Sequence, residues 1–294
     1  MRTASRPERI EALKSMRSPF PRSLTVAVGQ VALLQGSCAV QLRDGAVYVV
    51  PYTLVNARDP QIILSGPQAG RRSCDCALVH VDGFDNSIDE ARTNFEHIGA
   101  AYERSGGLCE MYGFAWRSNP GILFLMRAER EVDERAGLAL VRFLSSLEEA
   151  CPERKISVTA HSLGARVALR ALDWRVRNGH RPLESVALVA PAVPLAEVVP
   201  GGGLHGGFSG ARRLFIVRNS EDYVQGLFYP MLTLGRRSLG QDGLRAALAP
   251  MIAAARERGV ELIELDLAAV WGPRHSAIAN LDERFWAEYF SAGG

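Results

Sequence analysis

The stretch that decides the fold reads ISVTAHSLGARVALRAL and spans residues 156–172. Its opening residues, 156–160, are apolar or β-branched and predict a buried strand, and the chain then reads as a helix to about Arg177. The turn between them has a small-x-Ser-x-Gly pattern, with Ala160 and Gly164 on either side of Ser162. Small residues are needed there because a strand that turns sharply into a helix brings its backbone against neighbouring strands.

This turn predicts an exposed Ser162 hydroxyl at a helix N-terminus, where free N–H groups and the helix dipole favour a developing negative charge. A serine that merely caps an ordinary helix would fit the same five residues. The position between a well-formed strand and a well-formed helix favours a nucleophile.

Outward from this turn, short apolar strands alternate with amphipathic helices, which is typical of a parallel sheet covered on both faces. The expected strands are 77–81, 110–116, 156–160, 185–190, 213–218 and 260–266. Two helical stripes recur at steps of three and four residues, one within 88–102 and one within 136–147. We therefore expect an α/β fold with a mostly parallel central sheet and helices on both faces.

The residues before this region predict a different beginning. Residues 1–22 read as a polar N-terminal arm, and residues 23–294 as a single α/β domain. Within that domain, 24–34 and 46–55 are β-branched and apolar, which predicts N-terminal antiparallel strands. The basic residues before 24–34 give a weak likeness to a secretion signal, but Gly29 and Gln30 interrupt the apolar run, so a strand is the better interpretation.

Composition excludes several classes of protein. The 294 residues carry 34 basic and 32 acidic side chains, a formal charge of +2, and 47% are hydrophobic. Collagen-like, coiled-coil and disordered chains are excluded, and the charge favours neither nucleic acid nor an anionic membrane as a partner. No stretch approaches the roughly 20 apolar residues of a membrane-spanning helix. Oligomeric state is not indicated.

The cysteines predict a reducing environment. Five cysteines are an odd number in a chain large enough to bury its own core, which argues against a disulfide framework and for a cytoplasmic location. Cys74 and Cys76, with His80, could be metal ligands, but no fourth partner stands at zinc-site spacing, so two incidental thiols are the better interpretation. We expect no metal and no cofactor.

A serine nucleophile needs a base and a group that orients the base. The carboxyl ends of parallel strands meet at the ligand-binding edge of such a sheet, so the side chains after each strand are the candidates. His275 follows the last strand and is the predicted base, with His205 as an alternative. Asp222 follows the strand 213–218 and is the predicted acid, beside a solvated Glu221.

A further carboxylate, Glu197, is the reserve for the acid. The chain order Ser162, Asp222, His275 is the nucleophile, acid and base order of α/β-hydrolases.

From about residue 77 to 280 the sequence resembles a functionally uncharacterised branch of bacterial α/β-hydrolases. The segments that carry the resemblance are VHVDGFDNS (79–87), FAWRSNP (114–120), TAHSLGARVALRAL (159–172), ALVAPAVP (187–194), FIVRNSED (215–222), RRSLGQ (236–241) and RHS (274–276). The resemblance implies an esterase- or lipase-like serine hydrolase whose triad is Ser162, Asp222 and His275.

An oxyanion hole needs two backbone N–H donors. Leu163 supplies one, and by resemblance Phe84 supplies the other, in a tight loop permitted by Gly83. Relatives usually read His-Gly-aromatic here, whereas this chain has Asp82 before Gly83. A carboxylate near an oxyanion costs a few kcal/mol unless it is turned away or paired, for example with Arg117.

We expect the substrate pocket to be formed by Asp82, Gly83, Trp116, Phe124 and Tyr223, with apolar walls that suit the acyl or alkoxy group of a small-molecule ester. The predicted activity is hydrolysis of carboxylic esters through an acyl-enzyme. Two alternatives stay open: a weakly active or inactive binding module on the same fold, motivated by Asp82, and an amide or thioester hydrolase with the same triad.

Overall fold

A computed structural model describes residues 39–41, 47–49, 61–63, 74–116, 118, 125–244, 249–275 and 285–286. All described elements belong to residues 34–294, which form one compact unit. The predicted arm 1–22 and the predicted strand 24–34 lie outside the described residues. The division of the chain into an arm and one domain therefore stays a prediction.

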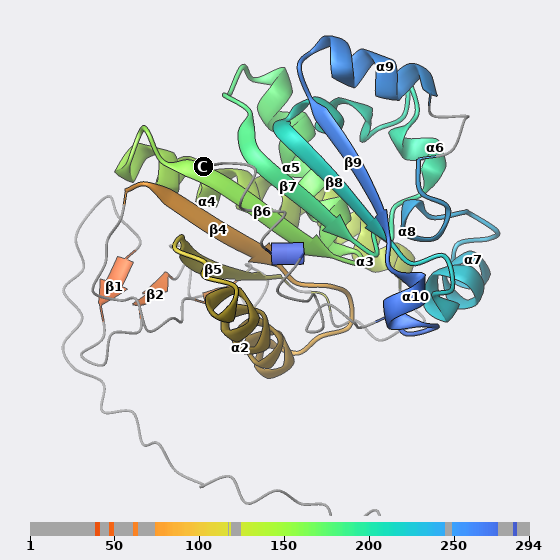
Figure 1. Cartoon of the computed structure of the whole chain (residues 1–294), viewed down its shortest axis with the longest axis horizontal. Helices are drawn as coiled ribbons and strands as arrows, with labels where there is room; N and C mark the ends of the chain where they lie inside the picture. The colour runs from red at the N-terminus through yellow and green to blue at the C-terminus, as the bar shows by residue number, and fades with distance from the viewer. Residues whose placement is uncertain are drawn as a thin grey trace, which may run out of the picture. The chain divides into compact units, whose positions relative to one another are not determined.

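The described strands form one nine-stranded sheet in the order β1-β2-β3-β5-β4-β6-β7-β8-β9 (Figure 1). The strands are β1 (Ala39–Gln41), β2 (Val47–Val49), β3 (Gln61–Ile63), β4 (Cys76–Val81), β5 (Glu110–Ala115), β6 (Lys155–His161), β7 (Leu183–Val189), β8 (Ala211–Arg218) and β9 (Glu261–Asp266). The first three pair antiparallel, and β3 joins β5 antiparallel. From β5 to β9 every neighbouring pair is parallel.

Helices of very different length connect the strands. The described ones are α2 (Ile88–Arg104), α3 (Leu125–Glu131), η2 (Val132–Ala136), α4 (Gly137–Ala150), α5 (Gly164–Arg177), α6 (Leu195–Val198), η3 (His205–Ser209), η4 (Val224–Phe228), α7 (Tyr229–Leu232), α8 (Leu239–Asp242), α9 (Ala249–Glu257) and α10 (Ala268–Trp271). Helix α2 begins at a capping box in which Ser87 and Glu90 exchange hydrogen bonds.

The sheet is buried on both faces because alternate residues of each strand enter different cores. Val186 and Leu188 of β7 pack in one cluster with residues of α4 and α5. Ala187 and Val189 pack in the other with residues of α2. Figure 1 shows these helices on opposite sides of the sheet. The predicted fold class is confirmed: a mostly parallel sheet with helices on both faces and antiparallel strands at its N-terminal side.

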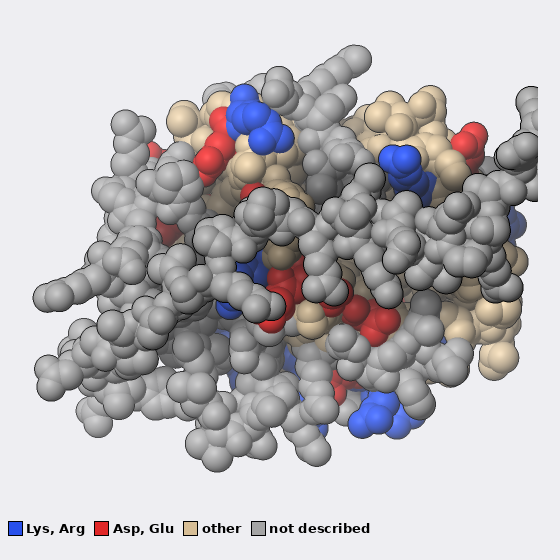
Figure 2. Space-filling view, turned by 90° about the horizontal axis from the view of Figure 1, so that it is seen from below, with Lys and Arg blue, Asp and Glu red and all other residues tan. Residues whose placement is uncertain are grey.

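Acidic and basic side chains both occur on the face shown in Figure 2. The full sequence has 34 basic and 32 acidic residues. No helix in the described ranges is long and apolar enough to cross a bilayer.

The cysteine prediction is wrong. Cys74 is bonded to Cys151, and Cys76 to Cys109. The odd count misled because four of the five cysteines pair, and Cys38 lies outside the described residues. Disulfides persist in oxidising compartments, so the thiol argument for a cytoplasmic location no longer holds.

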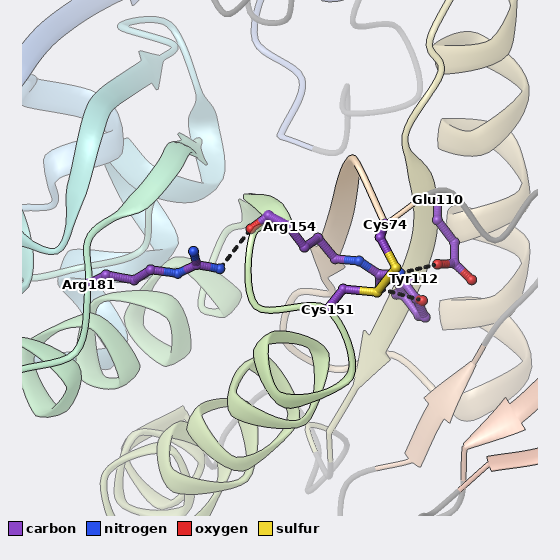
Figure 3. The surroundings of a disulfide bond; sticks show 6 residues. All are labelled: Cys74, Glu110, Tyr112, Cys151, Arg154 and Arg181. Carbon is purple, nitrogen blue, oxygen red and sulfur yellow. Dashed lines mark hydrogen bonds and ion pairs between the residues drawn. A yellow bond between two sulfur atoms is a disulfide. The ribbon is translucent and has the colours of Figure 1, made fainter.

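Both bonds lie where β4, β5 and β6 begin. Cys76 is the first residue of β4, Cys109 precedes β5, and Cys151 ends α4 shortly before β6. Arg154 lies beside the Cys74–Cys151 bond (Figure 3). Its Nη2 is 3.6 Å from Cys151 Sγ, and its Nη1 donates to the Tyr112 hydroxyl at 3.2 Å. The bonds therefore fasten the edge of the sheet opposite the carboxyl ends of the strands.

We expect reduction to destabilise the fold strongly. The bonds close loops with sequence separations of 77 and 33 residues, for which chain entropy gives about 4 kcal/mol of stabilisation each. Thermal unfolding with and without a phosphine reductant measures the loss, with Cys74→Ser and Cys76→Ser separating the two bonds. Titration of five free thiols in unreduced, unfolded protein would contradict the pairing.

Candidate active site

Ser162 occupies a strained turn directly after β6. Its φ is +52°, a left-handed conformation that non-glycine residues rarely adopt. Backbone hydrogen bonds on both sides hold it: the Ser162 N–H donates to the Val189 carbonyl at 2.9 Å, and its own carbonyl accepts from the Ala192 N–H at 3.0 Å. The neighbouring strand β7 and the loop after it thus fix the turn that carries the hydroxyl.

Gly164 shows why the turn requires small residues. A Cβ at this position would lie 2.4 Å from the Asp82 carbonyl oxygen and 2.7 Å from that of Val81. The first residue of α5 therefore lies directly against the end of β4. Any side chain at position 164 would push α5 away from the sheet, and Ser162 with it.

His275 follows β9 and α10 and reaches Ser162. Its Nε2 lies 2.8 Å from Ser162 Oγ, and its Nδ1 lies 2.6 Å from Asp222 Oδ2. With a neutral imidazole, the serine hydroxyl donates to Nε2 and the Nδ1–H donates to the carboxylate. The structure thus brings together the three side chains that the sequence analysis selected.

Asp222 is held rigidly after β8. It is 1% exposed, and its Oδ1 accepts the backbone N–H groups of Val224 at 2.9 Å and Gln225 at 3.1 Å. The other oxygen, Oδ2, is the one that faces His275. A carboxylate fixed by backbone donors can orient an imidazole without moving itself.

Asn219 is a residue that sequence reasoning missed. It is fully buried, and its Nδ2 donates to the carbonyls of Gly272 at 2.8 Å and Arg274 at 2.9 Å. These bonds tie the loop that carries His275 to the end of β8. Its place directly after a predicted strand was the available signal.

The alternative candidates have other partners. His205 Nδ1 lies 3.2 Å from the carbonyl of Val198, close to it in sequence. Glu197 accepts from Arg166 at 2.9 Å, and Glu221 is exposed. None of the three is bonded to Ser162 or His275 within the residues that the structure covers.

The loop after β4 lies beside Ser162. A Cβ built on Gly83 would be 3.4 Å from Ser162 Cβ, so the loop backbone passes close to the serine. Within the described ranges, the backbone N–H groups of Phe84 and Leu163 have no hydrogen-bond partner. Whether these two amides act as oxyanion donors stays a prediction.

The Asp82 carboxylate is bound by two amides. Asn86 donates to Oδ2 at 3.0 Å, and Asn94 of α2 lies 3.4 Å from Oδ1. Burial raises the pKa of Asp82, while hydrogen bonds from the Gly83 backbone and the two asparagines partly oppose that shift. The carboxylate is turned towards the start of α2 and anchors the loop. Arg117, the expected partner, lies outside the described residues.

The other predicted pocket residues are placed unevenly. Trp116 is buried and donates its indole N–H to the Asp82 carbonyl at 2.9 Å, so it supports the loop. Tyr223 is 53% exposed directly after Asp222, and Phe124 lies outside the described residues. Further exposed apolar side chains follow Tyr223, namely Leu227, Phe228, Met231 and Leu234.

Two buried histidines lie under the site. His80 Nδ1 is 2.9 Å from Thr159 Oγ1, and His161 Nε2 is 3.3 Å from the His275 carbonyl oxygen. Burial lowers the pKa of each ring from 6.5 to about 3, and for His161 the nearby His275 adds to the shift. Among the described residues, no group of three or more His, Cys, Asp or Glu side chains could hold a metal ion.

Comparison with known proteins agrees with this architecture. Residues 70–200 match a family described as "Alpha/beta hydrolase of unknown function (DUF900)". The fold is similar to poly(3-hydroxybutyrate) depolymerase from Bordetella parapertussis, with a TM-score of 0.50 and 16% identity over 84% of this chain and 89% of that chain. At that identity the likeness concerns the fold alone.

Two further solved structures are more distant. An esterase from the archaeon Pyrobaculum calidifontis has a TM-score of 0.45 and 12% identity over 80% of this chain and 82% of that chain. An esterase/lipase from an uncultured bacterium has a TM-score of 0.41 and 14% identity over 98% of this chain and 100% of that chain. No curated protein matches the sequence.

The buried histidines predict acid sensitivity. The pKa of both histidines is lower in the folded than in the unfolded chain. Below pH 6.5 the unfolded chain therefore binds protons that the folded chain does not, and the free energy of unfolding falls as the pH decreases towards 3. Each should cost about 1.4 kcal/mol per pH unit in that window. Urea unfolding at pH 6.5 and 4.5 measures this loss.

A pair of variants separates this effect from general acid denaturation. His80→Gln should remove about half of the pH dependence, whereas His97→Gln, at an exposed position on α2, should leave it unchanged. An unfolding free energy that is flat between pH 6.5 and 4.5 would contradict the prediction.

Proposed function

We propose that this chain, a member of the α/β-hydrolase superfamily, is a serine hydrolase that cleaves carboxylic esters through an acyl-enzyme. One observation carries the proposal: His275 lies within hydrogen-bond reach of both Ser162 Oγ, at 2.8 Å, and Asp222 Oδ2, at 2.6 Å. A serine, a base and an oriented carboxylate in this geometry have the arrangement needed to activate a hydroxyl.

In the first half of the reaction, Ser162 Oγ attacks the ester carbonyl carbon while His275 Nε2 takes the hydroxyl proton. Asp222 holds the imidazole in the tautomer that accepts at Nε2 and stabilises the imidazolium that forms. The carbonyl oxygen becomes negatively charged, and the N–H groups of Leu163 and Phe84 are the proposed donors to it. Collapse of this intermediate releases the alcohol, which takes the proton from His275.

In the second half, a water molecule loses its proton to His275 Nε2 and attacks the acyl carbon. The same two amides stabilise the second oxyanion, and the acid leaves as Ser162 regains its proton. Every proton passes through one ring nitrogen, so no metal or cofactor is required by these steps.

Exposed apolar side chains next to the site support an ester with an apolar group. Tyr223, which directly follows Asp222, is 53% exposed, and Leu227, four residues later, is 62% exposed. An apolar acyl or alkoxy group that leaves water for contact with such side chains gains roughly 25 cal/mol per Å² of buried surface. We therefore place the substrate among small-molecule esters with an apolar part.

The environment of Asp82 bears on the alternative of an inactive binding module. That alternative rested on a carboxylate facing the oxyanion, whereas the Asp82 carboxylate is bonded to Asn86 and Asn94. Burial raises the pKa of Asp82, and hydrogen bonds from the Gly83 backbone and the two asparagines oppose that shift. Amide and thioester hydrolysis use the same residues, and the choice of substrate in the assay separates them from ester hydrolysis.

Ser162→Ala should abolish labelling by a fluorophosphonate probe and lower kcat on short p-nitrophenyl esters by at least about 10³-fold, because the nucleophile is lost. Active-site labelling and initial rates measure both effects. Ser146→Ala, at an exposed position on α4, is the matched control. Folded wild-type protein that neither reacts with the probe nor cleaves any ester, amide or thioester would sink the proposal and favour a binding module.

Asp82 offers a separate test of the loop after β4, residues 82–84, which carries the proposed oxyanion donor Phe84 and is called the oxyanion loop below. Asp82→Ala leaves two amide donors without an acceptor and should lower kcat by about 10-fold through loosening of the loop. Asp82→Asn keeps one acceptor oxygen and should lose less. Steady-state kinetics on one p-nitrophenyl ester measures both variants. A tenfold rise in kcat for Asp82→Asn would show instead that the charge opposes the oxyanion.

A further inference from the structure

His161, the residue before Ser162, contacts the loop that carries His275. Its ring is 7% exposed and lies 5.2 Å from the His275 ring, centroid to centroid, at an interplanar angle of 39°. Its Nε2 lies 3.3 Å from the His275 backbone oxygen. His161 therefore touches both the ring and the main chain of the proposed base, without being bonded to Ser162 Oγ within the described residues.

The chemistry of this contact fixes the tautomer of His161. A carbonyl oxygen only accepts, so Nε2 carries the hydrogen and donates it. In a neutral ring Nδ1 is then an acceptor. Burial lowers the pKa of His161 to about 3, so the ring is neutral near pH 7 and adds no positive charge beside His275. His80 is also close to His161, and burial lowers its pKa to about 3.

The opposite side of the same ring faces the oxyanion loop. A Cβ on Gly83 would lie 3.0 Å from His161 Nδ1, which is closer than an ordinary van der Waals contact. It would lie 3.4 Å from the His161 carbonyl oxygen, which is the lower limit of an ordinary contact. Gly83 is therefore packed directly on His161. One buried ring thus lies between the loop of Phe84 and the loop of His275.

We infer that His161 is a positioning residue for the proposed reaction, which sets the His275 imidazole relative to Ser162 Oγ and to the Phe84 amide by packing between their two loops and donating Nε2–H to the His275 carbonyl. The inference rests on the proposed function. His161 does not act on the substrate; it restricts how far the base and the oxyanion donor move relative to one another. Small displacements of either group reduce the rate steeply.

Two substitutions separate the hydrogen bond from the bulk of the ring. His161→Phe keeps an aromatic ring but has no donor, and should lower kcat by about 3- to 10-fold, the effect of one hydrogen bond, with KM changed less than twofold. His161→Gln places an amide N–H near the position of Nε2 and should restore most of the loss. His97→Gln, at an exposed position, is the control.

Rates are expressed per site titrated with fluorophosphonate, so that unfolded protein does not count. The inference is overturned if His161→Phe and His161→Gln both keep the wild-type kcat per titrated site and change only the melting temperature. It is also overturned if the two variants lose the same activity, since the donor would then have no role.

A measurement independent of turnover keeps the inference testable if the proposed function fails. In the Ser162→Ala background, the proton between His275 Nδ1 and Asp222 can be followed by low-field proton NMR. We expect this resonance to broaden or disappear in His161→Phe and to persist in His161→Gln. An unchanged resonance in both would overturn the positioning role, whereas absence of probe labelling in the wild type with this NMR pattern intact would count against the hydrolase alone.

Discussion

The close approach of α5 to the end of β4 is the constraint on which the site depends. With hydrogen in place of a side chain at Gly164, the helix backbone lies against the carbonyls of Val81 and Asp82. Two residues before Gly164, Ser162 has a left-handed backbone conformation and lies beside the loop of Gly83. The strain of that turn, of order 1–3 kcal/mol, is offset by the backbone bonds and by the two buried cores on either side of the sheet.

The parallel sheet brings Ser162, Asp222 and His275 together although they are far apart in the sequence. Asp222 and the loop of His275 follow β8 and β9, and both strands run in the same direction as β6. Their carboxyl ends therefore meet at one edge, as the sequence argument assumed. Asn219 holds the segment that leads to His275 by donating to the carbonyls of Gly272 and Arg274, a contact that the sequence does not indicate.

Periodicity and order along the chain were sufficient to predict the strands β4 to β9 and to select Ser162, Asp222 and His275 as candidates. These features have local signals: apolar runs, a turn pattern and side chains after strand ends. The short strands β1 and β3 and the helix α9 carry weaker signals of that kind. The partners of the Asp82 carboxylate, Asn86 and Asn94, could not be predicted from the sequence, because they become its neighbours only when α2 folds back onto the loop.

The disulfides show the limit of counting arguments most clearly. Whether Cys74 meets Cys151 depends on where α4 ends relative to β4, and no pattern near either cysteine reports that. The disulfides and the proposed site lie at different ends of the strands. The two disulfides and the buried Arg154 lie where β4 to β6 begin, whereas the strained turn of Ser162 and the buried His161 lie at the carboxyl ends of the strands. The covalent restraints and the proposed site therefore lie at opposite ends of the same parallel strands, so neither takes up the space of the other.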